Sequence, residues 1–190
     1  MQRRTFIQAL GATPMVGSWA HAANWPERPL TFICPWPAGG TADATMRALC
    51  GAASKVLGQP IAVENRAGAA GMLGLKAMAS AKADGYTIGQ IPISVTRFAQ
   101  LGSVAIDPFK DLTYLARTSA QTFGIAVRVE SPWQTLRDWV NDAKSRPGKI
   151  NYGTSGIGGA THVGMEEFAL VAGISLNHIP YKGGAPALQD

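Results

Sequence analysis

Short apolar runs alternate with helical patterns through the first half of this 190-residue chain. The runs have the length and composition of buried strands and cover Pro29–Cys34, Ile61–Glu64 and Tyr86–Ile91. The segments between them, Thr41–Leu57 and Gly71–Ala81, carry apolar residues at helical spacing. Strands that alternate with helices form parallel sheets covered on both faces. The sequence therefore predicts an α/β fold with parallel-rich sheets.

A second series of elements follows an irregular stretch. We expect a helix to start at Asp107-Pro108 and a strand to cover Phe123–Val129. The next expected elements are a helix capped by Ser131-Pro132, the strand Ile150–Tyr152, the helix Ala160–Ala172, the strand Leu176–Pro180 and a last helix with Pro186 in its first turn. We therefore expect two lobes, residues 23–103 and 104–190. Because the chain stops early in its last helix, we also expect it to be a fragment or a truncated product.

Residues 1–22 have the pattern of a secretory signal peptide. Arg3-Arg4 precede the apolar stretch Thr5–Trp19, and Ala20-His21-Ala22 fits the cleavage site. Two arginines before Phe6 suit export by either the Sec or the twin-arginine route. The stretch is interrupted and shorter than the ~20 apolar residues of a membrane span, which disfavours an anchor. We expect cleavage after Ala22 and a periplasmic mature protein.

Charge and cysteine content narrow the classes of partner. Loss of Arg3 and Arg4 would leave 15 of the 17 basic residues against 12 acidic ones, without a basic run. This balance indicates neither a nucleic-acid partner nor a membrane-binding face. Cys34 and Cys50 are predicted to be buried thiols, because free cysteine is among the most buried residue types. No second Cys or His stands at ligand spacing, so no metal site is predicted.

Four loops rich in small or polar residues follow predicted strands. They are Pro35–Asp43, Glu64–Gly71, Tyr152–His162 and Pro180–Pro186. Ligands of open α/β sheets bind at the carboxyl ends of the strands. Since each half supplies two of these loops, the sequence predicts a cleft between two lobes. The Gly39-Gly40 pair, placed between a strand and a helix, predicts an anion site made of backbone N–H groups and a helix dipole.

The loop after Tyr152 is similar to a cofactor-binding motif and to a catalytic motif, but it matches neither. The dinucleotide pattern fails because Thr161 stands where the last glycine belongs, and the nucleophile elbow fails at Ile157. His162 is interpreted as a neutral ligand donor or a loop support rather than a base, because no third orienting group can be placed. Asp43 is expected to organise the first loop with Arg47. Trp36 either covers the cleft mouth or joins the core.

Five sequence blocks are typical of one known family. They are "PWPAGGTAD", "GQPIAVENRAGAAG", "DGYTIG", "NYGTSGIGGATHVGMEEF" and "HIPYKGGAPAL". In order and spacing they resemble the tripartite tricarboxylate transporter substrate-binding family, also called Bug solute receptors, from about Trp25 to Asp190. The resemblance implies a two-lobed periplasmic-binding-protein (Venus-flytrap) architecture. It also implies that family chains continue past the last helix, so the first lobe is expected to be incomplete here. Ala70 stands where the family commonly has glycine.

Carried over by motif, the ligand site would include residues from all four loops. Together with Trp36 and Asp43, these are Ala38, Gly39, Gly40, Asn65, Gly71, Thr154, Ser155, Gly159, Thr161, His162, Tyr181, Lys182 and Gly183. In addition, Lys182 or Arg97 is expected to pair with a second carboxylate of the ligand.

The resemblance implies a non-catalytic, monomeric receptor without cofactor or metal. It would capture a small carboxylate, such as a di- or tricarboxylate or an amino acid, for the membrane permease of a tripartite transporter. Three alternatives stay open at this point. They are a sensory co-receptor for a sensor kinase, a hydrolase built on Ser155 and His162, and a truncated product that binds nothing.

Overall fold

A sheet of three parallel strands organises the first lobe in the computed structural model, which describes residues 25–102, 105–120 and 122–190. The strands are β1 (Leu30–Cys34), β2 (Ile61–Asn65) and β3 (Thr87–Gly89), in the order β2-β1-β3. Leu30 lies opposite Ile61, and Thr31 lies opposite Thr87. β1 is thus the central strand, which explains why four of its five residues are buried.

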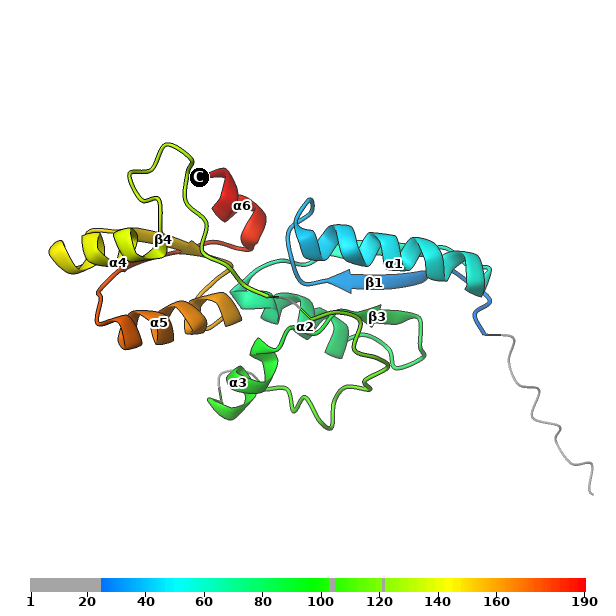
Figure 1. Cartoon of the computed structure of the whole chain (residues 1–190). Coiled ribbons are helices and arrows are strands. Elements are labelled where there is room, and N and C mark those ends of the chain that lie inside the picture. The colour runs from blue at the N-terminus through cyan, green and yellow to red at the C-terminus, as the bar shows by residue number, and fades with distance from the viewer. Residues whose placement is uncertain (1–24, 103–104, 121) are drawn as a thin grey trace, which may run out of the picture.

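Helices cover both faces of this sheet (Figure 1). The helix α1 (Thr41–Leu57) follows β1, and the short 3-10 helix η1 (Ala69–Gly71) leads from β2 into α2 (Met72–Ala79). One core cluster joins β1 to α1 through Phe32, Cys34, Met46 and Cys50. A second joins α2 to α3 (Ser94–Gln100) through Met72, Leu75 and Val95. The predicted buried thiols of Cys34 and Cys50 are confirmed.

The second lobe is built around two parallel strands. Its elements are α4 (Leu136–Ser145), β4 (Asn151–Thr154), α5 (Ala160–Ala172), β5 (Asn177–Pro180) and α6 (Gly184–Gln189). Asn151 of β4 lies opposite Asn177 of β5. The core of this lobe consists of Trp139, Ala143 and Ile150. The predicted α/β fold with parallel sheets is confirmed, whereas the lobe boundaries and the signal peptide stay predictions, and residues 1–24 lie outside the described part.

The connection between the lobes differs most from the sequence-based expectations. The helix expected at Asp107-Pro108 is wrong: Asp107 accepts hydrogen bonds in a turn from the N–H groups of Phe109 and Asp111. The strand expected over 123–129 is also wrong, because no described strand lies beside this exposed segment to pair with it. The helix α3 was not predicted at all.

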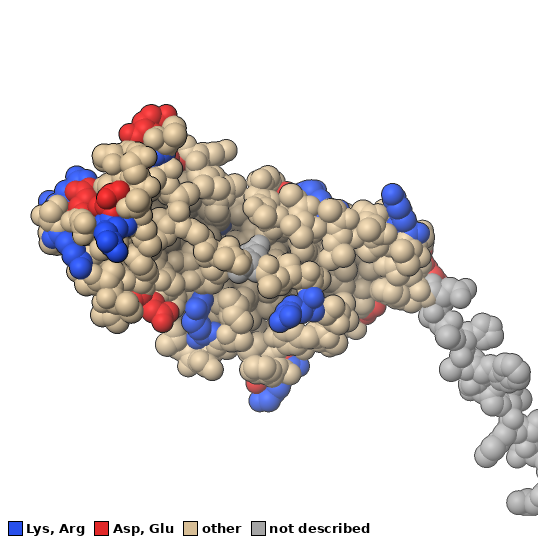
Figure 2. Space-filling view, in the orientation of Figure 1, with Lys and Arg blue, Asp and Glu red and all other residues tan. Residues whose placement is uncertain are grey.

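The start of α4 also differs from the expectation. Its cap is Thr135, which exchanges hydrogen bonds with Asp138 in a capping box, rather than Ser131-Pro132. No helix of the described residues is long and apolar enough to cross a membrane. Lys and Arg side chains are spread among acidic ones over the visible face and do not form one patch (Figure 2).

Candidate functional site

The N-terminal ends of α1 and α5 both point toward the junction between the lobes (Figure 1). The residue before each helix is a glycine in extended conformation, Gly40 or Gly159, and no side chain of the described residues caps either end. In α4, by contrast, the side chain of Thr135 caps the helix. Uncapped first-turn N–H groups and the positive end of the dipole attract anions. The junction is therefore suited to a negatively charged ligand.

Loops of the two lobes pack directly against one another at this junction. A Cβ atom on Gly159 would lie 3.5 Å from the Cβ atom of Ala70, and one on Gly158 would lie 2.6 Å from Cζ of Phe98. Gly183 lies so close to Pro37 that a Cβ atom there would overlap the proline ring. Glycine at these positions permits a close approach of the two backbones.

A cleft of about 440 Å³ opens between the lobes. The first lobe lines it with Ala69, Ala70, Met72 and Phe98, and the second lobe with Gly156, Ile157, Pro180, Tyr181 and Lys182. Small-molecule sites are typically about 300–1,000 Å³ and mostly apolar with few polar groups. This cleft therefore has room for a small metabolite, with Lys182 as the cationic group of its lining.

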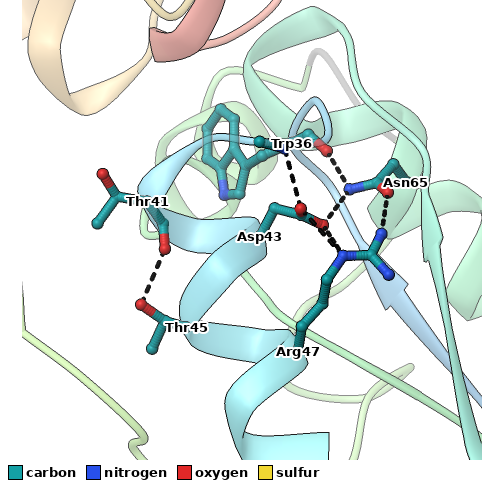
Figure 3. Close-up of polar contacts among 7 residues, drawn as sticks. Trp36, Thr41, Asp43, Thr45, Arg47 and Asn65 are labelled. Atoms are coloured by element: carbon teal, nitrogen blue, oxygen red, sulfur yellow. Dashed lines mark hydrogen bonds and ion pairs between the residues drawn. The ribbon is translucent and has the colours of Figure 1, made fainter.

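A polar network shapes the first loop beside this cleft (Figure 3). The buried Asp43 carboxylate accepts hydrogen bonds from the N–H of Gly39 at 2.9 Å and from Nε of Arg47 at 3.0 Å. The Asn65 amide donates to Asp43 at 2.7 Å and to the carbonyl of Trp36 at 2.9 Å, and accepts from Arg47 at 2.8 Å. Asp43 and Asn65 therefore hold the shape of the loop.

This network changes the acidity of Asp43. The hydrogen bond from Arg47, with those from Asn65 and Gly39, outweighs the effect of burial and lowers the pKa of Asp43 from 3.8 to about 2. The carboxylate is thus ionised at neutral pH. Its negative charge is neutralised by Arg47 and not left facing the junction.

In the second lobe, hydroxyl groups order the loop after β4. Thr154 Oγ1 lies 2.7 Å from Nε2 of His178 and accepts from the N–H of Gly156 at 3.3 Å. Ser155 Oγ lies 3.0 Å from Oγ1 of Thr161. Burial, and then the nearby His162, lower the pKa of His178, so its ring is neutral at neutral pH.

His162 belongs to an aromatic cluster behind that loop. Its Nδ1 accepts from the N–H of Gly158 at 3.2 Å, and its ring centroid lies 4.2 Å from that of His178. The Tyr152 ring stacks on His178 at 4.8 Å, and its hydroxyl donates to Glu166. Burial and this carboxylate raise the pKa of Tyr152. These contacts place His162 in support of the loop.

The remaining predicted site residues lie on both sides of the junction. Tyr181 and Lys182 line the cleft, and Ala38 and Gly39 are exposed on the first loop. Trp36 is half-buried and packs against the core of β1 and α1. Gly71 is buried against Pro92.

Sequence reasoning missed Phe98 and His178, and it noted Ala70 only as a departure from the family pattern. Phe98 lies on the unpredicted helix α3. The sequence does offer a signal for His178, because it stands in the predicted strand Leu176–Pro180 that leads directly into one of the four loops.

Residues 45–190 match the family described as tripartite tricarboxylate transporter family receptor. Over 197 aligned residues the chain is 39% identical to the "UPF0065 protein in gbd 5'region" of Cupriavidus necator, covering all of this chain and 60% of that protein. It is 35% identical to "Protein BugT" of Bordetella pertussis, covering 94% of this chain and 56% of that protein. The chain thus spans a little over half the length of these curated relatives.

Solved structures share the fold. They include the periplasmic binding protein BugD (TM-score 0.71, 29% identity, 87% of this chain and 56% of that one) and R. palustris Rpa4515 with adipate (0.69, 26%, 87% and 56%). A third is MatC of Rhodopseudomonas palustris with bound malate (0.74, 26%, 86% and 56%). The predicted two-lobed periplasmic-binding-protein architecture is confirmed, and the chain belongs to the tripartite tricarboxylate transporter receptor family, of the Bug type.

Proposed function

We propose that this chain forms the ligand-capturing part of a periplasmic receptor for a small carboxylate. The proposal rests on one observation: the N-terminal ends of α1 and α5, each preceded by a glycine and without a side-chain cap among the described residues, lie at the same junction. A negatively charged group at a helix N-terminus is stabilised by typically about 0.3–1 kcal/mol by the dipole, and by more where it is partly buried. A ligand carboxylate held there would be shielded from water by both lobes.

The ligand's size and charge follow from the cleft. About 440 Å³ suits a metabolite of a few carbon atoms, and Lys182 adds one positive charge. The similar structures hold malate and adipate, both dicarboxylates, which supports a carboxylate ligand for this chain as well.

The receptor role does not require catalysis. Ser155 lies within hydrogen-bond distance of Thr161, while Nδ1 of His162 accepts from Gly158, so these two side chains do not form a nucleophile–base pair here. If Ser155 nevertheless served as a nucleophile, purified protein would hydrolyse an ester substrate and Ser155→Ala would not.

Membership of the family supports a proposal for the partner and the location of this protein. We propose delivery of the ligand to the membrane permease of a tripartite transporter by a monomeric receptor. Loss of ligand uptake in cells that lack the receptor gene would support transport. Unchanged uptake with loss of signalling through a sensor kinase would support sensing. An N-terminus at Ala23 in the exported protein would support cleavage after Ala22.

Calorimetric titration of the purified full chain with mono-, di- and tricarboxylates tests the binding role. In the variant Gly40→Asp, a carboxylate would cap α1 and occupy the place proposed for the ligand. Because Asp is a slightly better cap than Gly, the melting temperature should stay equal or rise. Affinity for the carboxylate should fall at least about tenfold, or 1.4 kcal/mol.

The matched control is Gly51→Ala in the middle of the same helix. Gly51 is exposed, with no atom within 4 Å of its would-be Cβ, so alanine should stabilise α1 without touching its N-terminal end. Unchanged affinity in the control and loss in Gly40→Asp would support the proposal. Equal affinity in both variants, or no binding of any carboxylate to the wild type, would contradict it.

A further inference from the structure

Two consecutive alanines that line the cleft have left-handed backbone conformations. Ala69 has a φ of 47° and Ala70 a φ of 51°. Only glycine adopts this conformation without strain, because the Cβ atom of any other residue lies too close to the neighbouring backbone. Such strain persists only where the surrounding structure enforces it, and it is common at ligand sites. The packing around the two alanines therefore fixes this part of the cleft.

Contacts from both lobes hold Ala70 in place. From the first lobe, Ser94 Oγ donates to the carbonyl of Ala70 at 3.0 Å. From the second lobe, a Cβ atom on Gly156 would lie 3.3 Å from the backbone nitrogen of Ala70 and 3.5 Å from its Cα atom. Ala70 is accordingly only 2% exposed. Its methyl group thus belongs to a fixed wall that cannot move aside for a ligand.

This methyl group lies beside the N-terminal end of α5. Gly159 precedes that helix, and a Cβ atom on Gly159 would lie 3.5 Å from the Cβ atom of Ala70. A ligand carboxylate bound at the helix end would bring its own α-carbon, with any substituent there, close to the wall. The methyl group of Ala70 therefore limits the space next to the ligand's carboxylate.

Ala69 has the same strain but a different environment. Its φ differs from that of Ala70 by only a few degrees, and it also lines the cleft, yet Ala69 is exposed. The first-lobe atoms closest to the would-be Cβ atoms of Gly156 and Gly159 belong to Ala70. The two alanines therefore separate the effect of backbone strain from the effect of the methyl group at the end of α5.

We propose that Ala70 is a specificity-determining residue whose methyl group excludes carboxylates with a branched α-carbon. This inference rests on the proposed function and adds a limit on the shape of the ligand next to its carboxylate. One methyl or methylene group in an apolar pocket changes selectivity about 10–200-fold. A single methyl group in the wall is therefore enough to distinguish two acids that differ by one methyl group.

Pairs of acids that differ by one α-methyl group test the proposal by calorimetry on the purified full chain. Lactate is compared with 2-hydroxyisobutyrate, succinate with methylsuccinate, and adipate with 2-methyladipate. The wild type should bind the unbranched member of a pair at least about tenfold more tightly than the branched member. In Ala70→Gly a methyl-sized space opens beside the cleft, so this preference should fall by about tenfold or more.

The matched control is Ala69→Gly, which relieves the same strain without opening the wall. Its melting temperature should equal or exceed that of the wild type, and its preference for the unbranched acid should stay within about twofold of the wild-type value. An equal fall in both variants would assign the effect to strain in the loop and overturn the proposal. An unchanged preference in Ala70→Gly, or a wild type that binds both members of each pair equally, would overturn it too. If the wild type binds no carboxylate, the proposed function itself fails and this inference fails with it.

Discussion

Asp43 is the residue on which the shape of the first loop depends. Its carboxylate joins the N–H of Gly39, the guanidinium of Arg47 and the amide of Asn65. Removal of this acceptor would leave partly buried donors without a partner, and each such donor costs about 1–3 kcal/mol. The loop would then lose the geometry that presents the end of α1.

The variant Asp43→Asn should reveal this role through pH. The pKa of Asp43 is lowered to about 2 in the folded protein, so its stabilising contribution is complete above about pH 4 and is lost as pH falls toward 2. The difference in unfolding free energy between wild type and variant, measured by urea denaturation, should be about 1–3 kcal/mol at pH 6 and shrink below pH 4.

A matched control is Glu167→Gln, an exposed carboxylate on α5. It removes one negative charge without breaking a network, so its effect should stay within about 0.5 kcal/mol. A pH-independent difference for Asp43→Asn would mean that ionisation of the Asp43 carboxylate does not stabilise the network.

At the scale of elements, glycine sets how closely α2 approaches β1. Gly74 is the position of closest approach between α2 and the residue that follows β1. A Cβ atom there would lie 2.7 Å from Cβ and 2.8 Å from Cα of Pro35, and 3.2 Å from the carbonyl of Arg66. Since two of these atoms belong to the backbone, the clash cannot be relieved by rotating a side chain.

Gly74→Ala should therefore destabilise the protein, although alanine favours helices. Overpacking of this kind costs about 1–3 kcal/mol. Gly51→Ala in α1 should instead stabilise by about 0.5–1 kcal/mol. Thermal denaturation of both variants measures the contrast. A melting temperature that rises in both would show that α2 can shift away from Pro35 without cost.

Some helices and strands were predicted correctly from the sequence and others were not. The helices α1 and α5 and the strand β1 were predicted within a residue, because their apolar period and flanking glycines are local signals. The turn at Asp107 and the unpaired segment 123–129 were not, because an apolar run becomes a strand only where another strand pairs with it. The helix α3 was missed because Ser94 at its start is buried against Ala70. This contact joins residues far apart in the sequence, and the local spacing of apolar residues does not predict it.

At the scale of the whole molecule, contacts between Gly183 and Pro37 set how closely the lobes approach. Gly183 has a φ of 167°, an extended conformation open to any residue, so the requirement for glycine comes from the neighbouring ring. Gly184, the next residue, has no atom within 4 Å of its would-be Cβ. The two positions form a matched pair for testing lobe closure.

Gly183→Ala should push the lobes apart. We expect a larger radius of gyration by small-angle X-ray scattering and about tenfold weaker carboxylate binding, because loops of both lobes would no longer meet around the ligand. Gly184→Ala should change neither quantity. An unchanged radius of gyration in Gly183→Ala would mean that the junction adjusts locally and the spacing of the lobes is set elsewhere.

The sequence alone determined the α/β class, the order of most elements, the four loops that meet the junction and the family. These follow from local periods, glycine positions and short motifs, which can be read along the chain. Only the tertiary structure decided that Asn65 and Asp43 shape the loop, and that Ala70 and Phe98 meet the second lobe. Burial and hydrogen bonding between distant residues arise from the packing of the chain in three dimensions, and no local pattern specifies them.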